Sequence, residues 1–332
     1  MSATPRRKAE PILSAHGIVN RFGRQALHDK LDLDVAQGEI LGIAGRSGSG
    51  KSVLLKTLTG LHNPNAGTVL FSGKTLASMS PADRAACIGV LFQQGALFSS
   101  LSVAQNVMLP IREHTALPPP DQEKVATMKI ELAGLPADAG IKLPSQLSGG
   151  MVKRAALARA LALDPRILFL DEPTSDLDPI TASGIDDLIR ELNRGMGITI
   201  VIVTHDLTTL VTVCHRVAVL VDRKLVVGTI AELKHSHDPW IEELLHGPRD
   251  ARHDVPDVEL DDLVARAIAD VLHVHGHGQP AVGRDGSRAE PQVREPEPGV
   301  AQAVAEGEEG LPGDIQVLGC VLLIGLRRAA GA

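Results

Sequence analysis

One glycine-rich octapeptide constrains the fold of this chain more than any other feature. Residues Gly45–Ser52 read Gly-Arg-Ser-Gly-Ser-Gly-Lys-Ser, which matches the pattern G-x-x-x-x-G-K-[ST] at every fixed position. A short apolar run, Glu39–Gly45, precedes the octapeptide, and a helical stretch from about Ser52 to Leu61 follows it. A buried strand, a glycine loop and a helix in this order are typical of α/β folds built on a parallel sheet.

The chemistry of this loop indicates a site for the phosphates of a nucleotide. Its glycines let backbone N–H groups turn inward, and the following helix presents its positive N-terminal end to the same anion. Lys51 brings a charge to the β- and γ-phosphates, and the Ser52 hydroxyl is a hard oxygen ligand of the kind that Mg²⁺ prefers. The residues expected to surround the phosphates are Gly45, Arg46, Ser47, Gly48, Ser49, Gly50, Lys51 and Ser52.

Two adjacent carboxylates complement the loop. The segment Arg166–Pro173 reads Arg-Ile-Leu-Phe-Leu-Asp-Glu-Pro, so Asp171 and Glu172 follow a buried strand. Ligands of α/β folds bind at the carboxyl ends of parallel strands. We expect Asp171 to hold Mg²⁺ through water, and Glu172 to orient and polarise the attacking water as a general base. An isolated Asp-Glu pair is more often a helix cap, and the phosphate loop is what favours the catalytic interpretation.

The chain to about residue 248 otherwise alternates strand-like and helix-like segments, which predicts an α/β core with parallel pairing. Alternating apolar and polar residues near the N-terminus predict antiparallel strands with one wet face. A mostly helical insert is expected from about Val103 to Leu147, with a stiff break at Pro118–Pro120 before a helix over Asp121–Ala133. The remaining expected strands are Ile12–Phe22, Leu31–Val35, Gly67–Gly73, Ile167–Leu170 and Ile198–Val203, with a hairpin over Val217–Val227 that turns at Asp222–Arg223.

Composition excludes several classes of protein. The 332 residues carry a net charge of −7 and six aromatic side chains, with no Tyr, which argues against the basic, aromatic surfaces that bind RNA or single strands. Three widely spaced cysteines, Cys87, Cys214 and Cys320, indicate a reducing compartment rather than a disulfide framework. The most apolar stretch, Ile315–Leu326, is shorter than the about 20 residues that span a bilayer, and no signal peptide is expected.

The charge divides the chain near residue 250. Residues 1–250 hold 26 basic and 26 acidic side chains, whereas residues 251–332 hold 7 Arg, 14 acids and no Lys. We therefore expect a disordered N-terminus over residues 1–10, one domain over 11–248 and an acidic, largely disordered tail over 249–332. The tail contains one amphipathic pattern over Leu260–Leu272, which is typical of a helix. It also contains a histidine tract at His273–His277, and we interpret these histidines as solvated rather than metal-binding. It is either a genuine appendage or a frame artefact at the end of the gene, and its composition favours the second.

Further motifs give the chain a specific resemblance. Leu147-Ser-Gly-Gly-Met151 lies between the phosphate loop and Asp171 and resembles the signature motif of ABC-type ATPases, with Met151 where Gln is usual. The resemblance covers about residues 10–248 and implies a P-loop NTPase fold with a RecA-like parallel sheet core, an N-terminal antiparallel β subdomain and a helical subdomain at about 103–147. It assigns Gln93 to the Gln loop that reaches Mg²⁺ and the attacking water, Asp178 to the D-loop, His205 to the switch histidine, and Phe22 to adenine stacking, although a core role for Phe22 is equally compatible.

The same resemblance implies a homodimer that hydrolyses ATP. Two copies would sandwich two ATP molecules, each held by Lys51, Asp171, Glu172 and His205 of one subunit and by Ser148, Gly149 and Gly150 of the other. The last three residues open a helix, so their N–H groups can point at the γ-phosphate in trans. ATP would close the dimer, and hydrolysis would open it.

Segments around the signature indicate what the ATPase drives. Gln94–Phe98, Asn106–Thr115, Pro144–Met151 and Asp178–Thr181 resemble the ATPase subunit of Mla-type transporters. That family implies an integral membrane permease (MlaE-like), an MCE-domain lipid carrier as an indirect partner, no nucleic acid, and a peripheral location on the cytoplasmic face of a bacterial inner membrane. Neither the lipid nor the direction of its movement follows from the sequence. Asp176 stands in the D-loop where the family more usually has a small residue, and its effect does not follow from the sequence either.

Two alternatives stay open. The chain could serve an ABC transporter for another solute, or it could be an ABC ATPase that transports nothing. Only 55 positions separate Gln93 from Ser148, so the coiled-coil insertion of the DNA-repair members does not fit, and the single motif set differs from the paired domains of the translation-related members. A binding module without ATPase activity would lack Glu172 and His205.

Overall fold

A computed structural model describes residues 11–23 and 25–246. The expectations for residues 1–10, for the tail at 249–332, for the amphipathic pattern at 260–272 and for the histidine tract at 273–277 lie outside these residues. Among the residues described, none of the helices combines the length and the hydrophobicity that a membrane span requires.

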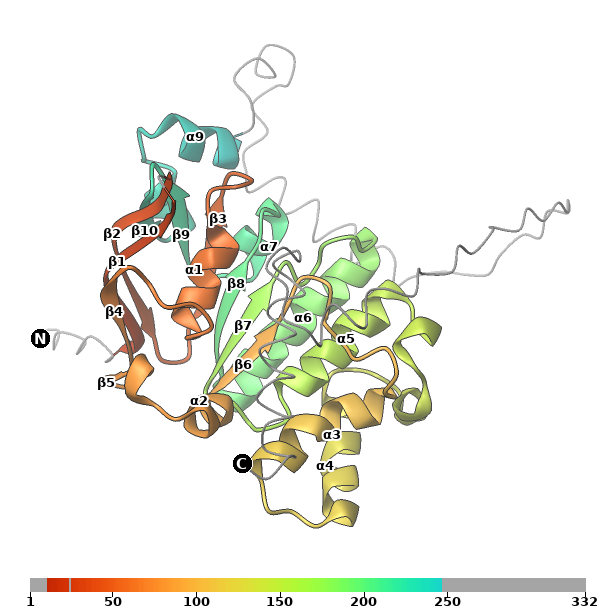
Figure 1. Cartoon of the computed structure of the whole chain (residues 1–332). Helices are drawn as coiled ribbons and strands as arrows, with labels where there is room; N and C mark the ends of the chain where they lie inside the picture. Colours follow the sequence, from red (N-terminus) through yellow and green to blue (C-terminus); the bar gives the residue numbers. More distant parts are fainter. Residues whose placement is uncertain (1–10, 24, 247–332) are drawn as a thin grey trace, which may run out of the picture. The chain divides into compact units, whose positions relative to one another are not determined.

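A six-stranded sheet lies at the centre of the described chain (Figure 1). Its strands follow the order β10-β9-β3-β8-β7-β6, and every pair is parallel except β9 with β10. The strands are β3 (Ile40–Gly45), β6 (Ile88–Leu91), β7 (Ile167–Asp171), β8 (Thr199–Val203), β9 (Arg216–Val221) and β10 (Lys224–Gly228). The predicted parallel core is confirmed, and so is the hairpin, whose turn residues Asp222 and Arg223 both have positive φ.

A second, antiparallel sheet is built from the N-terminal strands in the order β2-β1-β4-β5. Its members are β1 (Pro11–Phe22), β2 (Gln25–Ala36), β4 (Ala66–Phe71) and β5 (Lys74–Thr75). The inward-facing residues Leu13, Ile18, Leu31 and Leu33 are buried. This sheet corresponds to the antiparallel region that the alternating pattern predicted.

Alternate residues of the central strands bury two different faces. Ile167 and Phe169 of β7 pack in one core cluster with α1 (Lys51–Leu58) and the antiparallel sheet. Leu168 and Leu170 pack in another with α5 (Gly149–Ala160) and α6 (Pro179–Met196). Successive side chains of a strand point to opposite faces, so an uninterrupted apolar run buries both. Figure 1 shows α1 on one side of the central strands and α5 and α6 on the other.

The helical insert has a core of its own. Buried residues of α3 (Val103–His114) and α4 (Pro119–Leu132) pack against small alanines of α5. Ser102 and Gln105 form a capping box at the start of α3. The remaining helical elements are α2 (Pro81–Cys87), α7 (Leu207–Thr212), α8 (Ile230–Leu233), α9 (Pro239–His246) and the short 3-10 turns Leu76–Ser78, Ala137–Ile141 and Pro144–Gln146.

Some sequence-based boundaries were wrong. Helix α4 begins at Pro119 rather than at Asp121. Proline is well tolerated at the first helical position, because the N–H that it lacks would have no partner within the helix there. Helix α1 ends at Leu58 rather than Leu61, since Gly60 adopts φ +74° just beyond it. The second N-terminal strand begins at Gln25, well before Leu31. Strand β6 was not predicted, because its four residues, which include Gly89, give no clear period.

Candidate functional site

The glycine loop joins β3 to α1, as its position between an apolar run and a helical stretch predicted. Gly48 and Gly50 have φ of +74° and +103°, a backbone region that L side chains rarely adopt. A Cβ on Gly50 would also lie 2.9 Å from the Nε2 atom of the buried His28. Steric crowding and backbone conformation therefore both require glycine at position 50.

The loop presents polar groups that suit an anion. Lys51 Nζ donates to the carbonyl oxygens of Gly45 at 2.7 Å and of Arg46 at 3.1 Å, so the ammonium lies over the loop. Burial lowers the pKa of Lys51, while the charges of Glu172 and Asp171 act in the opposite direction. The Ser49 hydroxyl is buried with no hydrogen-bond partner. An unpaired buried hydroxyl in a loop that also carries the Lys51 ammonium fits an approaching phosphate oxygen.

Asp171 ends β7 beside the first residues of α1. Its residue is 8% exposed, and its pKa is raised to about 6 by burial first and by the neighbouring charge of Glu172 second. The Ser52 hydroxyl and the charges of Lys51 and Lys56 oppose that rise in the pKa. Carboxylate and hydroxyl oxygens are the donors that Mg²⁺ prefers. Within the described residues, no group of three or more His, Cys, Asp or Glu could hold a metal ion.

Glu172 points toward the residues that follow β8. Its Oε1 lies 2.8 Å from His205 Nδ1, and Thr204 Oγ1 donates to its Oε2 at 3.3 Å. Its φ of +49° is unusual for a residue with a side chain, a strain of about 1–3 kcal/mol that the surroundings must hold. Its N–H donates to Val203 O at 2.8 Å. A nearly buried carboxylate, paired with a largely exposed histidine, is suited to accept a proton from water.

The signature residues lie against the segment after Glu172. Ser148 caps α5 by accepting from Met151 N, and Gly149 and Gly150 form its first turn. A Cβ on Gly150 would lie 2.4 Å from Thr181 Cγ2, so no side chain fits there. Asp178 caps α6 by accepting from two backbone N–H groups at 3.0 and 3.1 Å. No hydrogen bond joins this region to the glycine loop anywhere in residues 11–23 and 25–246, and α1 and α5 lie on opposite faces of the sheet (Figure 1).

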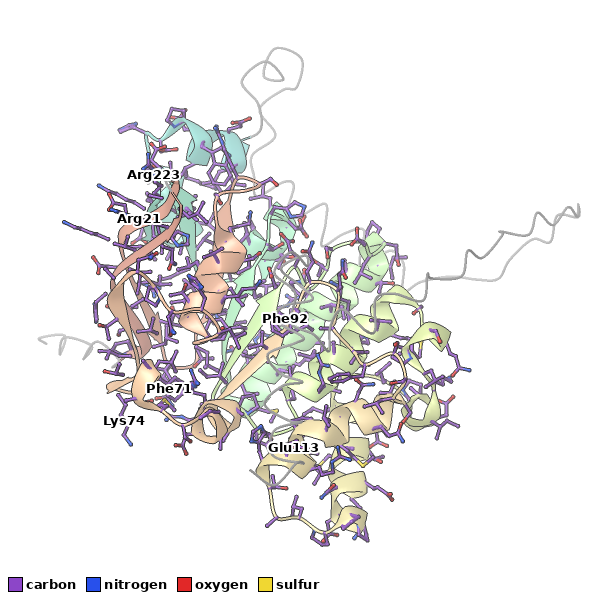
Figure 2. All side chains as sticks on the ribbon, viewed as in Figure 1. Arg21, Phe71, Lys74, Phe92, Glu113 and Arg223 are labelled. Atoms are coloured by element: carbon purple, nitrogen blue, oxygen red, sulfur yellow. The ribbon has the colours of Figure 1, made fainter. Side chains whose placement is uncertain are left out.

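The two remaining predicted positions lie at strand ends. Gln93 follows β6, and the adjacent Phe92 is visible at the end of that strand in Figure 2. Phe22 ends β1, but its side chain is outside the part of the chain that the structure describes, so adenine stacking stays a prediction.

Lys153 was missed by the sequence reasoning. This lysine of α5 donates to the carbonyl oxygens of Gln93 and Glu172. A signal for it existed, because Gly150, Lys153 and Leu157 share the buried stripe of α5 at helical spacing.

Comparisons with known proteins agree with this geometry. A family model described as ABC transporter matches residues 28–175. The intermembrane phospholipid transport system ATP-binding protein MlaF of Escherichia coli (strain K12) is 40% identical over 232 residues, which cover 69% of this chain and 86% of that protein. The probable ribonucleotide transport ATP-binding protein mkl of Mycobacterium leprae (strain TN) is 38% identical over 241 residues, which cover 71% of this chain and 69% of that protein. A solved dimer of the ATP-binding cassette MJ0796 in a post-hydrolysis state, bound to ADP and Pi, matches with a TM-score of 0.61 at 30% identity and covers 65% of this chain and 98% of that one.

Proposed function

Because this chain belongs to the ABC transporter family and is an ATP-binding subunit of such a transporter, we propose that it supplies the energy for moving phospholipids between the inner and outer membranes of a bacterium. The observation that carries this proposal is the 40% identity to MlaF over 86% of the length of that relative. The match to mkl, at 38% identity, reaches 69% of that protein. Transport of another solute, ribonucleotides included, is the second candidate.

We assign the chemistry of hydrolysis to four side chains. Lys51 would hold the β- and γ-phosphates, and Glu172 would accept a proton from the attacking water. His205 would contact the γ-phosphate while its Nδ1 stays 2.8 Å from Glu172 Oε1. Gln93 would orient the water from the loop after β6. The pairing of Glu172 with His205, two residues that are 33 positions apart, is the geometric support for these roles.

A magnesium ion belongs to the same proposal. Ser52 and Asp171 would hold it, with Gln93 as a further oxygen donor. When bound, it would neutralise the charge that develops on the phosphates during transfer. The influence of the Ser52 hydroxyl on the pKa of Asp171 supports the assignment, since it requires these two oxygen ligands, one on α1 and one on β7, to lie near each other.

ABC cassettes work as pairs, and we propose a homodimer with two sites of mixed origin. Ser148, Gly149 and Gly150 of one copy would meet the phosphates on the glycine loop of the other. The separation of the two motifs within one chain supports this arrangement, because α1 packs on one face of the central sheet and α5 packs on the other.

Mixing two inactive variants tests the arrangement. Lys51→Met damages the loop and Ser148→Arg damages the signature, so each homodimer should be inactive. A mixed dimer would contain one site with both defects and one intact site, and activity should return on mixing. If the mixture stays as inactive as its parts, the motifs do not act in trans.

The membrane partners are the finer part of the proposal. We expect an MlaE-like integral permease to bind the helical insert and the segment after Gln93, and an MCE-domain lipid carrier to act beyond the permease. The subunit would lie on the cytoplasmic face of the inner membrane. Glu113, near the C-terminal end of α3, lies on this insert and well away from Phe92 in Figure 2.

Purification of the native complex distinguishes the two candidate substrates. The permease and any extracytoplasmic partner should be identified, and the reconstituted complex should be assayed for ATP-dependent movement of a fluorescent phospholipid between vesicles. Co-purification of an MCE-domain protein together with lipid movement supports the proposal. A periplasmic solute-binding protein as partner, with no lipid movement, contradicts it and leaves the ATPase assignment intact.

A further inference from the structure

The signature helix α5 carries a buried lysine with three acceptors around its ammonium. Lys153 is 7% exposed and faces inward between Gly150 and Leu157. Its Nζ donates to the backbone carbonyl of Gln93, to that of Glu172 at 2.9 Å, and to Ser175 Oγ at 3.2 Å. An ammonium has three N–H donors, so the three acceptors satisfy it fully.

The three acceptors come from three segments that are distant in sequence. Gln93 lies after β6, Glu172 directly follows the neighbouring strand β7, and Ser175 belongs to the turn that leads to α6. One side chain of the signature helix therefore joins two loops of the proposed catalytic site. Hydrogen bonds from an ionised donor are about twice as strong as those between neutral groups, so the ammonium can hold the two loops firmly against α5.

The contact at Glu172 acts on a strained residue. With φ at +49°, the direction of its carboxylate depends on how its peptide groups are held. Its carbonyl accepts from Lys153 Nζ and from Ser175 Oγ, both at 2.9 Å, while its N–H is bound to β8. Without the lysine, the carbonyl loses one of the two side-chain donors that keep this backbone in place.

Two further charged residues complete the arrangement. Burial lowers the pKa of Lys153, and the opposing charge of Asp176 is the largest influence that raises it. Asp176, the unusual residue of the D-loop, therefore stabilises the buried ammonium. Arg159, also on α5, donates to Ala96 O at 2.6 Å and to Gly95 O at 2.9 Å, so α5 holds the segment 93–96 at more than one point.

We propose that Lys153 is a positioning residue for ATP hydrolysis, which fixes the carbonyl of Glu172 and the loop at Gln93 to the signature helix so that the carboxylate keeps its working direction. The proposal rests on the role assigned above to Glu172. The proposal also predicts that a movement of the loop at Gln93 would change the position of Glu172, because the ammonium of Lys153 is bonded to both.

The test compares variants of the full chain by ATP hydrolysis, nucleotide affinity and thermal unfolding. Lys153→Met removes the charge and all three donors, and it should lower kcat at least about tenfold, or ~1.4 kcal/mol, while Kd for ATP stays within about twofold. Lys153→Arg keeps a cation with several donors and should recover kcat to within about threefold of the parent.

Lys129→Met is the matched control. Lys129, on α4, is also a buried lysine, at 2% exposure. Its ammonium pairs with Asp164, in the turn between α5 and β7, and no hydrogen bond within the described part of the chain joins it to the nucleotide loops. It should lower the unfolding temperature with little change in kcat. If Lys153→Met does not fold, Lys153→Gln carries the same expectation, because it keeps donors but loses the charge and the reach.

The outcomes separate this inference from the function on which it rests. An unchanged kcat in Lys153→Met, or an equal loss of kcat in Lys129→Met, overturns the positioning role. A loss of ATP affinity that parallels the loss of kcat also overturns it, since Lys153 would then act on binding. Glu172→Gln is measured alongside: full activity of that variant refutes the role of Glu172 itself, whatever Lys153 does.

Discussion

A buried acid between α6 and α7 should limit the stability of this protein at neutral pH. Asp186 is 6% exposed, and its two oxygens lie 3.0 and 3.3 Å from Thr209 Oγ1. The same hydroxyl lies 3.0 Å from Asp206 Oδ2. A hydroxyl has one hydrogen, so it cannot donate to both carboxylates at once. Replacing Asp186 by Asn removes the charge and adds two N–H donors, which leaves the Thr209 hydrogen free for Asp206.

The magnitude follows from the shifted titration. Burial is the largest cause that raises the pKa of Asp186 from 3.8 to about 6, Thr209 opposes it, and the charge of Asp206 adds to it. The folded state therefore binds more protons than the unfolded state between these values, and the stability contributed by this group falls as pH rises through them. The full cost of ionising it in the fold is ~3 kcal/mol above pH 7, of which about half is already present at pH 5.

The assay is thermal unfolding of the parent and of Asp186→Asn between pH 5 and pH 8. The variant should be the more stable at pH 8, and its advantage should grow by roughly 1 kcal/mol from pH 5 to pH 8, or about 2–4 °C for a domain of this size. A change in hydrogen bonding that does not depend on pH cancels from this difference. Glu191→Gln is the control, because Glu191 is an exposed acid on the same helix and does not influence the pKa of Asp186. An advantage of equal size at both pH values would refute the reasoning.

Three further predictions address the nucleotide site and the tail. Glu172→Gln should retain ATP binding and trap a closed dimer on a sizing column with no turnover, and hydrolysis at the parental rate would exclude Glu172 as the base. Gly50→Ala places a Cβ 2.9 Å from His28 Nε2 at φ +103°, so it should lower stability by about 1–3 kcal/mol and weaken binding of a fluorescent ATP analogue; an unchanged melting curve would contradict the crowding seen there. Deletion of residues 251–332 should leave ATPase activity and permease binding intact, because the last helix described, α9, already completes a core cluster with Ile241 and Leu245; loss of either activity would show that the tail is needed.

Parts of the fold that depend on local pattern can be read from the sequence. The runs at β3, β7 and β8 are uninterrupted and apolar because each strand is buried on both faces. The hairpin of β9 and β10 follows from two apolar runs around a polar turn. Strand β6 escaped because it is short and is defined by pairing with β7, which lies about 80 residues later.

The candidate site divides in a similar way. The glycine loop and the Asp171-Glu172 pair are recognisable because their chemistry requires particular residues at consecutive positions. The contact of Glu172 with His205 and Thr204 depends on β7 and β8 being neighbours. The role of Lys153 could not be predicted, because the buried stripe that it shares with Gly150 and Leu157 does not indicate which distant carbonyl groups its ammonium contacts.

By itself, the sequence determined which residues could bind phosphate, since a cradle of N–H groups, a lysine and a hydroxyl are local in the chain. Only the tertiary structure decided how Glu172 is aimed, which carbonyls Lys153 holds, and why Asp186 must share one donor with Asp206. The contacts that hold Glu172, Lys153 and Asp186 join residues 19 to 60 positions apart in the chain. The physical reason is that burial, charge and hydrogen bonding depend on distance in space, and the order of residues along the chain does not report that distance.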